Sequence, residues 1–510
     1  MNTHDQTHSR GQVGRAIARG AAWTVCLRLA TQLVSVVSTL VLARLLTPRD
    51  FGIYALAMLV YAFVELLSAF GFGSALIQNQ DATDAHYNTA WTLHVLFSLL
   101  TSSLLFLFAP FAAAWLAEPQ LETVLRFLCL LFLIHGLRNI GVINFQKYMT
   151  FDREFRFSLM VKLAGFLVTV PLAFLLRSYW AMLWGLLISS LMSLLLSYVM
   201  QSFRPKLELS RWREMISFSA WLQLNNILAY FSRHSEKLLV SRFLDVAAVG
   251  SLQLAREIGQ VLNEVVMSVN RAVYPGYARV NKSSTQLRDV FCDVNGVLLM
   301  VGIPVALGLF SVAHLFVPTV LGEQWLHIVP VVKWLALASL MTVGVSSTNN
   351  VLIALGRTKW ASAVLALNLG LLLAFMLYLL PLHGIVGVAY AAVSSLLATL
   401  VFCYVALRSH IGLSLRHVAR IAIRPTVSAM IMLLAVQGLF PSHAVGSSLT
   451  VQLLQLAGAI ATGALGYCSA LLCLWWLSAR PDGPELRTLC LAYERSGMGG
   501  FLLPKEKRHA

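Results

Sequence analysis

Charge is scarce in this 510-residue sequence, because Asp, Glu, Lys and Arg together make up only 12% of it. A soluble domain usually carries about 25% charged residues. Apolar residues reach 58% and the mean hydropathy is +0.74, which excludes an ordinary soluble protein and predicts a polytopic membrane protein. The formal net charge of +16 does not indicate nucleic-acid binding, since the basic residues are scattered between apolar spans rather than clustered in a stripe.

The motifs of several enzyme classes are missing as well. The sequence contains no G-x-x-x-x-G-K-[ST] loop, which excludes nucleotide hydrolysis by a P-loop. It has no Asp-x-Asp and no long loop with an acid–base pair for sugar transfer, so we expect no catalytic residues and no enzyme. The seven cysteines have neither metal-ligand spacing nor a disulfide framework, and we expect no metal and no cofactor. Transport would then be driven by an ion gradient or by removal of the product.

Long apolar runs dominate what is present and predict an all-α fold with about 14 transmembrane helices. Residues 1–19 are polar and basic and precede the first run without a cleavage pattern, so we expect them to remain as a cytoplasmic tail. The predicted spans are 20–43, 52–77, 90–115, 123–144, 157–176, 180–202, 216–241, 248–275, 292–316, 327–354, 361–380, 385–407, 421–440 and 450–478.

Lys and Arg mark one side of the predicted membrane. Most of the basic residues flank the spans on the side that holds both termini, while the opposite side holds only Arg44, Arg49, Arg177 and Arg242. By the positive-inside rule both termini are cytoplasmic, in a multi-pass protein of the inner membrane. The loops on the outer side are all short, so no extracytoplasmic domain is expected.

The sequence also repeats itself at an offset of 198 residues. Ala22-Trp23 matches Ala220-Trp221, and Arg44 and Gly52 match Arg242 and Gly250. Each unit holds six spans, which predicts two parallel six-helix lobes related by a pseudo-twofold axis along the membrane normal. The predicted parts are an N-terminal tail at 1–19, an N-lobe at 20–204, a C-lobe at 205–408, two extra helices at 409–478 and a cytoplasmic C-terminal tail at 479–510.

A polar stripe in the eighth span is the strongest functional signal. Polar or bulky residues recur at steps of three and four between Gln253 and Tyr274, which places them on one helix face. Charges spread over about 27 Å of a membrane helix are costly unless they line a wet cavity or pair with one another. We therefore interpret the stripe as one wall of a translocation pathway.

The repeat places spans 1 and 2 opposite spans 7 and 8, and polar residues occur in all four. Arg–Glu pairs that only pin helices together are the alternative interpretation. The predicted substrate-binding residues are Arg28, Gln32, Gln223, Asn226, Tyr230, Arg233, Arg256, Gln260, Asn263, Asn270 and Arg271. The ion-coupling candidates are Glu65, Glu257 and Glu264.

These residue types indicate the chemistry of the cargo. Arginine suits phosphate because its planar fork donates two hydrogen bonds, and Asn, Gln and Tyr suit the hydroxyls of sugars. A cavity for hydrophobic cations would instead favour carboxylates and aromatic rings. In the fourth span, His135, Arg138 and Asn139 either extend the cavity or satisfy the backbone of a broken helix, and the second interpretation is favoured.

Three stretches carry a resemblance to a known family. Residues 42–55 (LARLLTPRDFGIYA), 70–78 (FGFGSALIQ) and 146–157 (QKYMTFDREFRF) resemble the polysaccharide flippases of the multidrug/oligosaccharidyl-lipid/polysaccharide exporter superfamily, and the colanic-acid-like exopolysaccharide branch most. The resemblance implies two six-helix bundles around a central cavity, alternating access, and an undecaprenyl-pyrophosphate-linked oligosaccharide as cargo. In a related lipid II flippase two extra helices accompany a groove for the lipid tail, which would suit the last two spans.

The resulting hypothesis is a flippase that moves lipid-linked repeat units to the periplasmic leaflet for exopolysaccharide, capsule or O-antigen synthesis. Its partners would be that lipid-linked cargo, membrane lipids, and a polysaccharide polymerase with a chain-length regulator. Two alternatives stay open. One is a cation-coupled drug exporter of the same superfamily, and the other is a membrane glycosyltransferase or polymerase, against which the short outer loops argue.

Overall fold

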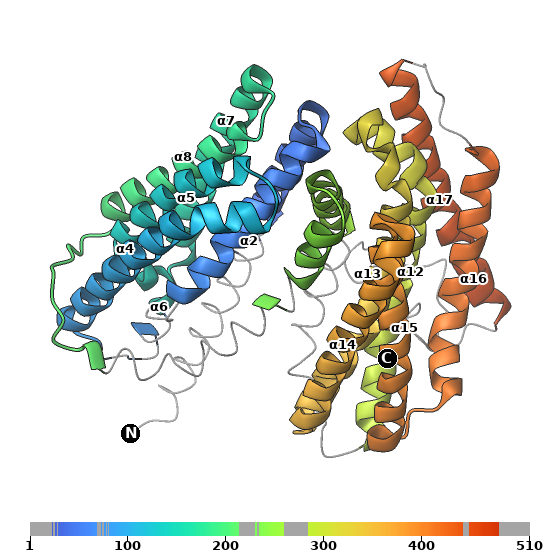
Figure 1. Cartoon of the computed structure of the whole chain (residues 1–510). Coiled ribbons are helices and arrows are strands. Elements are labelled where there is room, and N and C mark those ends of the chain that lie inside the picture. Colours follow the sequence, from blue (N-terminus) through green and yellow to red (C-terminus); the bar gives the residue numbers. More distant parts are fainter. Residues whose placement is uncertain are drawn as a thin grey trace, which may run out of the picture. The chain divides into compact units, whose positions relative to one another are not determined.

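In the part of the chain that the computed structural model describes, the fold is all-α, with helices joined by turns and loops (Figure 1). That part comprises residues 23, 26–27, 29–68, 73, 76–77, 79, 81–213, 230–231, 234–259, 284–441 and 448–478. The chain forms two compact units, Met1–Ser251 and Leu252–Ala510. The predicted lobe boundaries at 204/205 and 408/409 stay predictions.

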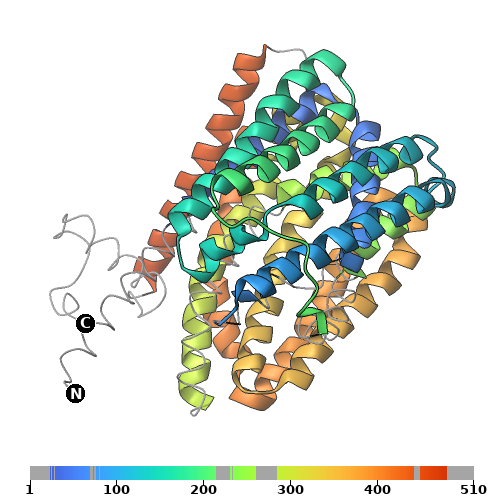
Figure 2. The same cartoon turned by 90° about the vertical axis from the view of Figure 1, so that its left-hand side faces the viewer.

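The first unit consists of long helices that pack as antiparallel pairs. Helix α4 packs against α5, α7 against α8, and α5 in turn against α8, so the three contacts build one bundle (Figures 1 and 2). Helix α2 lies against both α4 and α5. The bounds are α2 Pro48–Ser68, α4 Asp84–Trp115, α5 Gln120–Leu137, η1 Ile140–Ile143, α6 Asn144–Lys147, α7 Phe151–Leu176 and α8 Trp180–Val199.

Short reversals join these pairs. The turn after α4 passes through Ala117 at φ 54°, and α7 ends at Arg177 at φ 44°, both in the left-handed region that lets a helix stop abruptly. At the start of α4, Thr83 and His86 form a reciprocal cap. Because the connections are only a few residues long, consecutive helices must run antiparallel, as the alternating spans of the sequence predict.

The second unit repeats this design with two further helices. Helix α15 packs against both α13 and α14, while α12 packs against α13 and against the final pair, α16 and α17. A π-helical turn η2 and a 3₁₀ turn η3 connect α12 to α13. The bounds are α12 Ser284–Phe316, η2 Val317–Leu321, η3 Glu323–Ile328, α13 Val329–Ala354, α14 Thr358–His383, α15 Ile385–Ile411, α16 Leu415–Leu439 and α17 Leu449–Leu477.

Ten helices in the described part are long and apolar enough to cross a membrane, and they coincide with ten of the predicted spans. The predicted first span contains the shorter apolar helix Leu29–Leu45, and the second overlaps α2. Most of the predicted seventh and eighth spans lies outside the described residues, so the count of fourteen stays a prediction. The all-helical, multi-pass membrane fold is confirmed.

Candidate functional site

Five of the predicted site residues lie in the described part of the chain. Gln32, Glu65 and Tyr230 belong to the first unit, and Arg256 and Glu257 to the second. The other predicted residues lie outside the described residues, so their roles stay predictions. They are Arg28, Gln223, Asn226, Arg233, Gln260, Asn263, Glu264, Asn270 and Arg271.

The polar stripe begins as predicted. Residues 246–259 are helical, and Gln253 Nε2 donates to Glu257 Oε1 at 2.7 Å, a bond that requires both side chains on one helix face. Arg256, between them in sequence, is half-buried. Within the second unit this helix packs on α13, where Ser339 Oγ donates to the Gly259 carbonyl at 3.3 Å. A stripe of amide, carboxylate and guanidinium groups on the helix at 246–259 is thus present up to Glu257.

Tyr230 has a clear packing contact. Its side chain is buried, and its hydroxyl donates to the Leu59 carbonyl of α2 at 2.8 Å. Its ring also lies 5.5 Å from that of Phe63 on α2. These contacts join Tyr230 to α2, so this side chain contributes to helix packing. The substrate-binding role of Tyr230 stays a prediction. Gln32 is exposed on its helix, and its substrate-binding role also stays a prediction.

A chain of polar side chains crosses the first unit beside Glu65. The hydroxyl of Tyr61, one turn before Glu65 on α2, lies 3.3 Å from Nδ1 of His135 on α5. Nε2 of His135 lies 3.1 Å from the hydroxyl of Ser190 on α8. Three helices are therefore linked through one imidazole in a largely apolar bundle. Glu65 itself is exposed, and an exposed carboxylate on a membrane helix requires a wet or paired surrounding.

Sequence reasoning missed Tyr61 and Ser190 as hydrogen-bond partners of His135. The step of four from Tyr61 to Glu65 is the helical period and could have drawn attention to Tyr61. Nothing in the sequence points to Ser190 as the partner of His135, because the two are 55 residues apart. In the described part of the chain, no group of three or more His, Cys, Asp or Glu side chains is placed to hold a metal ion.

Asn139 satisfies the backbone at a helix break, as the favoured interpretation predicts. Helix α5 ends at Leu137, and the fully buried Asn139 accepts a hydrogen bond from Gly141 N at 2.9 Å. Its amide nitrogen Nδ2 donates to the Phe203 carbonyl at 2.6 Å. The side chain therefore closes the break between α5 and η1 and is not available to a substrate.

The sequence repeat is visible at the starts of two helices. Thr47 Oγ1 accepts from Asp50 N at 3.3 Å before α2, and Asp245 Oδ1 accepts from Ala248 N at 2.8 Å before the helix at 246–259. Thr47 and Asp245 are separated by the repeat offset of 198 residues. Both act as N-caps that satisfy free backbone N–H groups. The repeat thus sets the same helix start twice.

The two repeat-equivalent glycines, Gly52 and Gly250, lie against each other within the first unit. A Cβ added at Gly52 would overlap the Val246 carbonyl, and a Cβ added at Gly250 would overlap the Pro48 carbonyl. Pro48 and Val246 are again 198 residues apart, so the contact is reciprocal, as at a twofold axis. Only glycine allows two helix backbones to approach this closely.

Charged groups hold the chain next to this crossing. Arg49 Nη2 lies 3.1 Å from both carboxylate oxygens of Glu118, whose side chain is 5% exposed. Asp50 Oδ1 accepts from the backbone N of Tyr179 at 3.1 Å. Burial raises the pKa of the Tyr179 hydroxyl. These contacts tie the first turn of α2 to the turns after α4 and α7. They therefore hold in place the part of α2 that crosses the helix at 246–259.

The sequence matches one protein family and several proteins of known name. Residues 41–330 match the family described as "Polysaccharide biosynthesis protein". The chain is 25% identical to the teichuronic acid biosynthesis protein TuaB of Bacillus subtilis over 70% of this chain and 75% of that protein. It is 27% identical to the lipopolysaccharide biosynthesis protein WzxC of Escherichia coli (63% and 66% covered). It is 26% identical to the succinoglycan biosynthesis transport protein ExoT of Rhizobium meliloti (64% and 66%).

Two solved structures share the architecture. The lipid II flippase MurJ in an inward closed conformation matches with a TM-score of 0.70 at 12% identity, over 89% of this chain and 100% of that one. An inward-facing multidrug transporter of the MATE family matches with a TM-score of 0.55 at 15% identity, over 75% and 94%. At these identities the likeness shows the fold alone, which is the two-lobe fold that the internal repeat predicts.

Proposed function

Because the chain belongs to the polysaccharide biosynthesis protein family, we propose that it carries lipid-linked oligosaccharide units across the membrane for the synthesis of a cell-surface polysaccharide. The observation that carries this proposal is the match to that family over residues 41–330. It is joined by similarity to proteins named for lipopolysaccharide biosynthesis and for succinoglycan transport. The helical membrane fold fits a transporter, and the sequence offers no catalytic motif.

The physical problem that such a protein solves is the polar head group. A pyrophosphate and several sugars cannot cross about 30 Å of hydrocarbon unsolvated. Fixed donors on the polar faces of the helices would replace water, while the isoprenoid tail stays in lipid. In this proposal Arg256 and the predicted Arg28, Arg233 and Arg271 bind the pyrophosphate, the amides and Tyr230 bind sugar hydroxyls, and the lobes alternate access.

Ion coupling is the second part of the proposal. The Glu65 carboxylate is exposed on α2, one turn from Tyr61 and its contact to His135. Glu257 is held by Gln253 on the polar stripe. Either carboxylate, or the predicted Glu264, would bind a proton or sodium ion and so bias the two access states. A drug exporter with a MATE-like fold would need the same coupling, so the fold does not separate the two functions, but the named relatives favour polysaccharide precursors.

The deciding experiment follows the cargo. Cells that lack the protein are expected to accumulate lipid-linked repeat units on the cytoplasmic leaflet and to lose surface polymer, and the full-length protein should restore both. Radiolabelled repeat units, probed in inside-out and right-side-out vesicles with a glycosidase that cannot enter, report the leaflet. Loss of polymer without accumulation on the cytoplasmic leaflet would refute the flippase function. Export of a cationic dye that competes with the cargo would favour the drug exporter.

We also propose that the protein lies in the inner membrane with both termini in the cytoplasm. Its further partners would be a polymerase and a chain-length regulator. In a cysteine-free background, which exposed Cys26, Cys468 and Cys473 make necessary, single cysteines should report the sides. We expect cysteines at the exposed positions 81, 206 and 357 to be shielded from an impermeant thiol reagent in intact cells. Cysteines at the exposed positions 177 and 323 should react, and labelling at 206 would reverse the orientation.

A further inference from the structure

Helix α16 carries a ladder of arginines along one face of its first ten residues. Arg416, Arg420 and Arg424 recur at steps of four, so their side chains leave the same side of the helix about one turn apart. From Arg416 to Arg424 the helix rises about 12 Å. Arg416 and Arg420 precede the predicted span 421–440 and Arg424 lies inside it, so we expect the three arginines to extend from the membrane surface into the hydrocarbon of one leaflet. Helix α16 contains no Asp or Glu to neutralise it.

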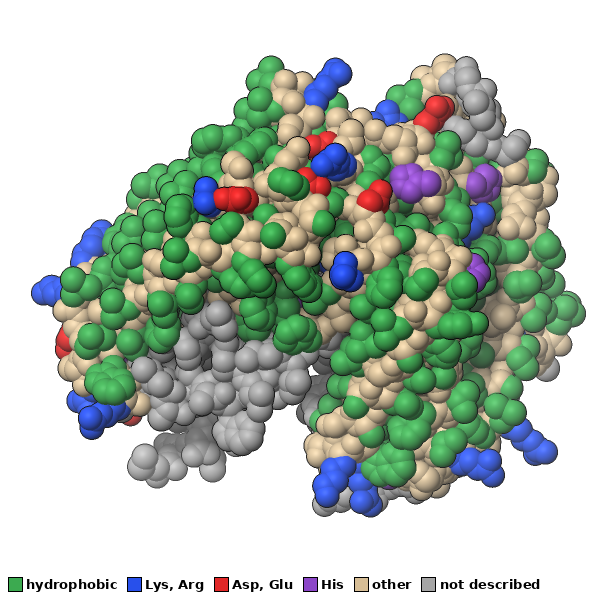
Figure 3. All heavy atoms as spheres, in the orientation of Figure 1, with side chains coloured by type: hydrophobic (Ala, Val, Ile, Leu, Met, Phe, Trp, Pro, Cys, Tyr) green, Lys and Arg blue, Asp and Glu red, His purple; other side chains and the backbone are tan. Residues whose placement is uncertain are grey.

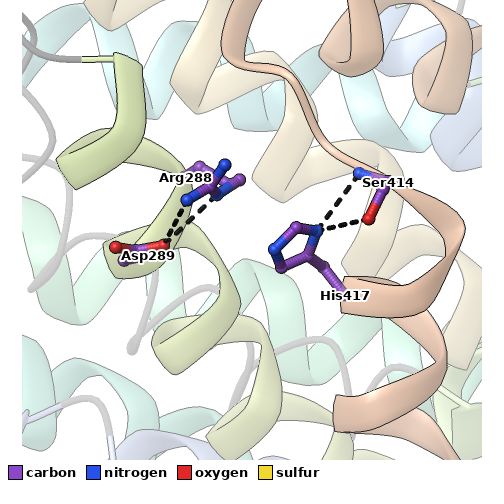
Figure 4. Close-up of polar contacts among 4 residues, drawn as sticks. All are labelled: Arg288, Asp289, Ser414 and His417. Atoms are coloured by element: carbon purple, nitrogen blue, oxygen red, sulfur yellow. Dashed lines mark hydrogen bonds and ion pairs between the residues drawn. The ribbon is translucent and has the colours of Figure 1, made fainter.

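Within the described part of the chain, Arg416 and Arg420 have no side-chain partner. Arg416 and Arg420 are exposed, and neither makes a hydrogen bond or ion pair with any residue that the structure describes. On α12, which packs against α16, Asp289 is already engaged, because its carboxylate lies 3.2 Å from the guanidinium of its neighbour Arg288. Figure 4 shows this pair on α12 beside the cap formed by Ser414 and His417 at the start of α16. A second acid, Asp293, lies one turn further along α12.

The same face of α16 continues as a hydrophobic surface. Ile423, Val427, Ile431 and Leu434 follow the arginines at helical spacing and are 57%, 41%, 45% and 64% exposed. The buried face of the helix, with Ser428, Met432 and Val436, is turned to the rest of the second unit. Hydrophobic side chains are spread widely over the face seen in Figure 3, while Lys and Arg side chains gather mainly near its upper and lower ends. One face of α16 is thus cationic at the N-terminal end of the helix and apolar further along. A lipid has the same order, with a charged head group followed by a hydrocarbon chain.

We propose that Arg416 and Arg420, with Arg424 as a deeper rung, bind the phosphate head group of a lipid in the leaflet at this end of the second unit. Two guanidinium forks can each donate two hydrogen bonds to phosphate oxygens, and the hydrocarbon chain lies along Ile423 to Leu434. Phosphate is the chemistry that the site selects. A polyprenyl diphosphate and a bulk anionic phospholipid both supply it.

This inference goes beyond the proposed function, since it concerns a surface of α16 and not the predicted cavity. The competing explanation is that these arginines only orient the helix by the positive-inside rule. Lysine orients a helix as well as arginine does, but it binds phosphate as a point charge without the fork. The double lysine variant therefore separates a topological role from a phosphate site while preserving insertion.

Native mass spectrometry of the full-length protein, titrated with undecaprenyl diphosphate, phosphatidylglycerol or phosphatidylcholine, tests the proposal. We expect R416Q/R420Q to weaken binding of the anionic lipids at least about tenfold, and R416K/R420K to weaken it by a smaller factor. R357Q/K359Q, which removes two exposed charges from the junction of α13 and α14, should bind as wild type does.

Each outcome decides one point. Loss of undecaprenyl diphosphate binding alone assigns the site to the polyprenyl carrier, and loss of both anionic lipids assigns it to membrane phosphates in general. Wild-type binding by R416Q/R420Q, or equal loss in R357Q/K359Q, overturns the proposal. Translocation by the wild-type protein in the same preparation is measured separately, so failure of the proposed function would be seen there and not in the binding series.

Discussion

Alanine at Gly52 or at Gly250 is expected to slow transport at least about tenfold, although alanine is the better helix former at both positions. Each added Cβ would overlap a backbone carbonyl of the opposing helix, so the backbones must separate rather than a side chain turn away. Overpacking of this kind costs about 1–3 kcal/mol, and about 1.4 kcal/mol corresponds to a factor of ten. Alanine gains up to about 1 kcal/mol in helix propensity, so a loss would identify the crossing as its cause.

The measurement is translocation of lipid-linked oligosaccharide by proteoliposomes that hold matched amounts of protein. Gly370→Ala on α14 is the control, since nothing lies within 4 Å of a Cβ at that position and its φ is ordinary. Because Gly52 and Gly250 serve one contact, the double alanine variant should be little worse than either single variant. Wild-type rates from both single variants would show that the close crossing plays no part in the transport cycle.

The fold could be predicted from the sequence to the extent that it depends on local pattern. Hydrophobic runs and short polar reversals located ten of the membrane helices, with helix ends that differ from the predicted ones by up to eight residues, because burial in lipid requires uninterrupted helix. The repeat also predicted that Gly52 and Gly250 are equivalent. It did not predict their contact, since equivalent residues touch only where they lie on the symmetry axis, and sequence does not locate that axis.

The candidate site was less accessible to sequence reasoning for a related reason. The bond from Gln253 to Glu257 could be foreseen, because it joins residues one helical turn apart. The contacts of His135 with Tyr61 and Ser190, and of Tyr230 with Leu59, join residues that are 55 to 171 positions apart. Such contacts depend on how helices pack, which hydrophobic periodicity constrains only by face. The polar stripe was therefore predictable, and the contacts of His135 and Tyr230 were not.

Arg256 tests the stripe most directly. We expect Arg256→Ala to lower translocation at least about tenfold at an unchanged amount of protein in the membrane, because a charge-assisted bond to phosphate contributes about 1.5–3 kcal/mol. Arg256→Lys should be intermediate, since the charge survives and the fork does not. Arg242→Ala is the matched control, because Arg242 is exposed, precedes the helix at 246–259 and lies outside the stripe.

Protein level and transport rate together separate the two interpretations of Arg256. The side chain is half-buried, and removal of a half-buried charge that pins helices would lower the amount of folded protein. A variant that accumulates normally but transports slowly assigns Arg256 to the pathway, and a higher cargo concentration at half-maximal rate would further assign it to binding. A variant that fails to accumulate assigns it to helix packing. Normal accumulation with normal transport would remove Arg256 from the pathway, and the stripe would then have to act through Gln253 and Glu257.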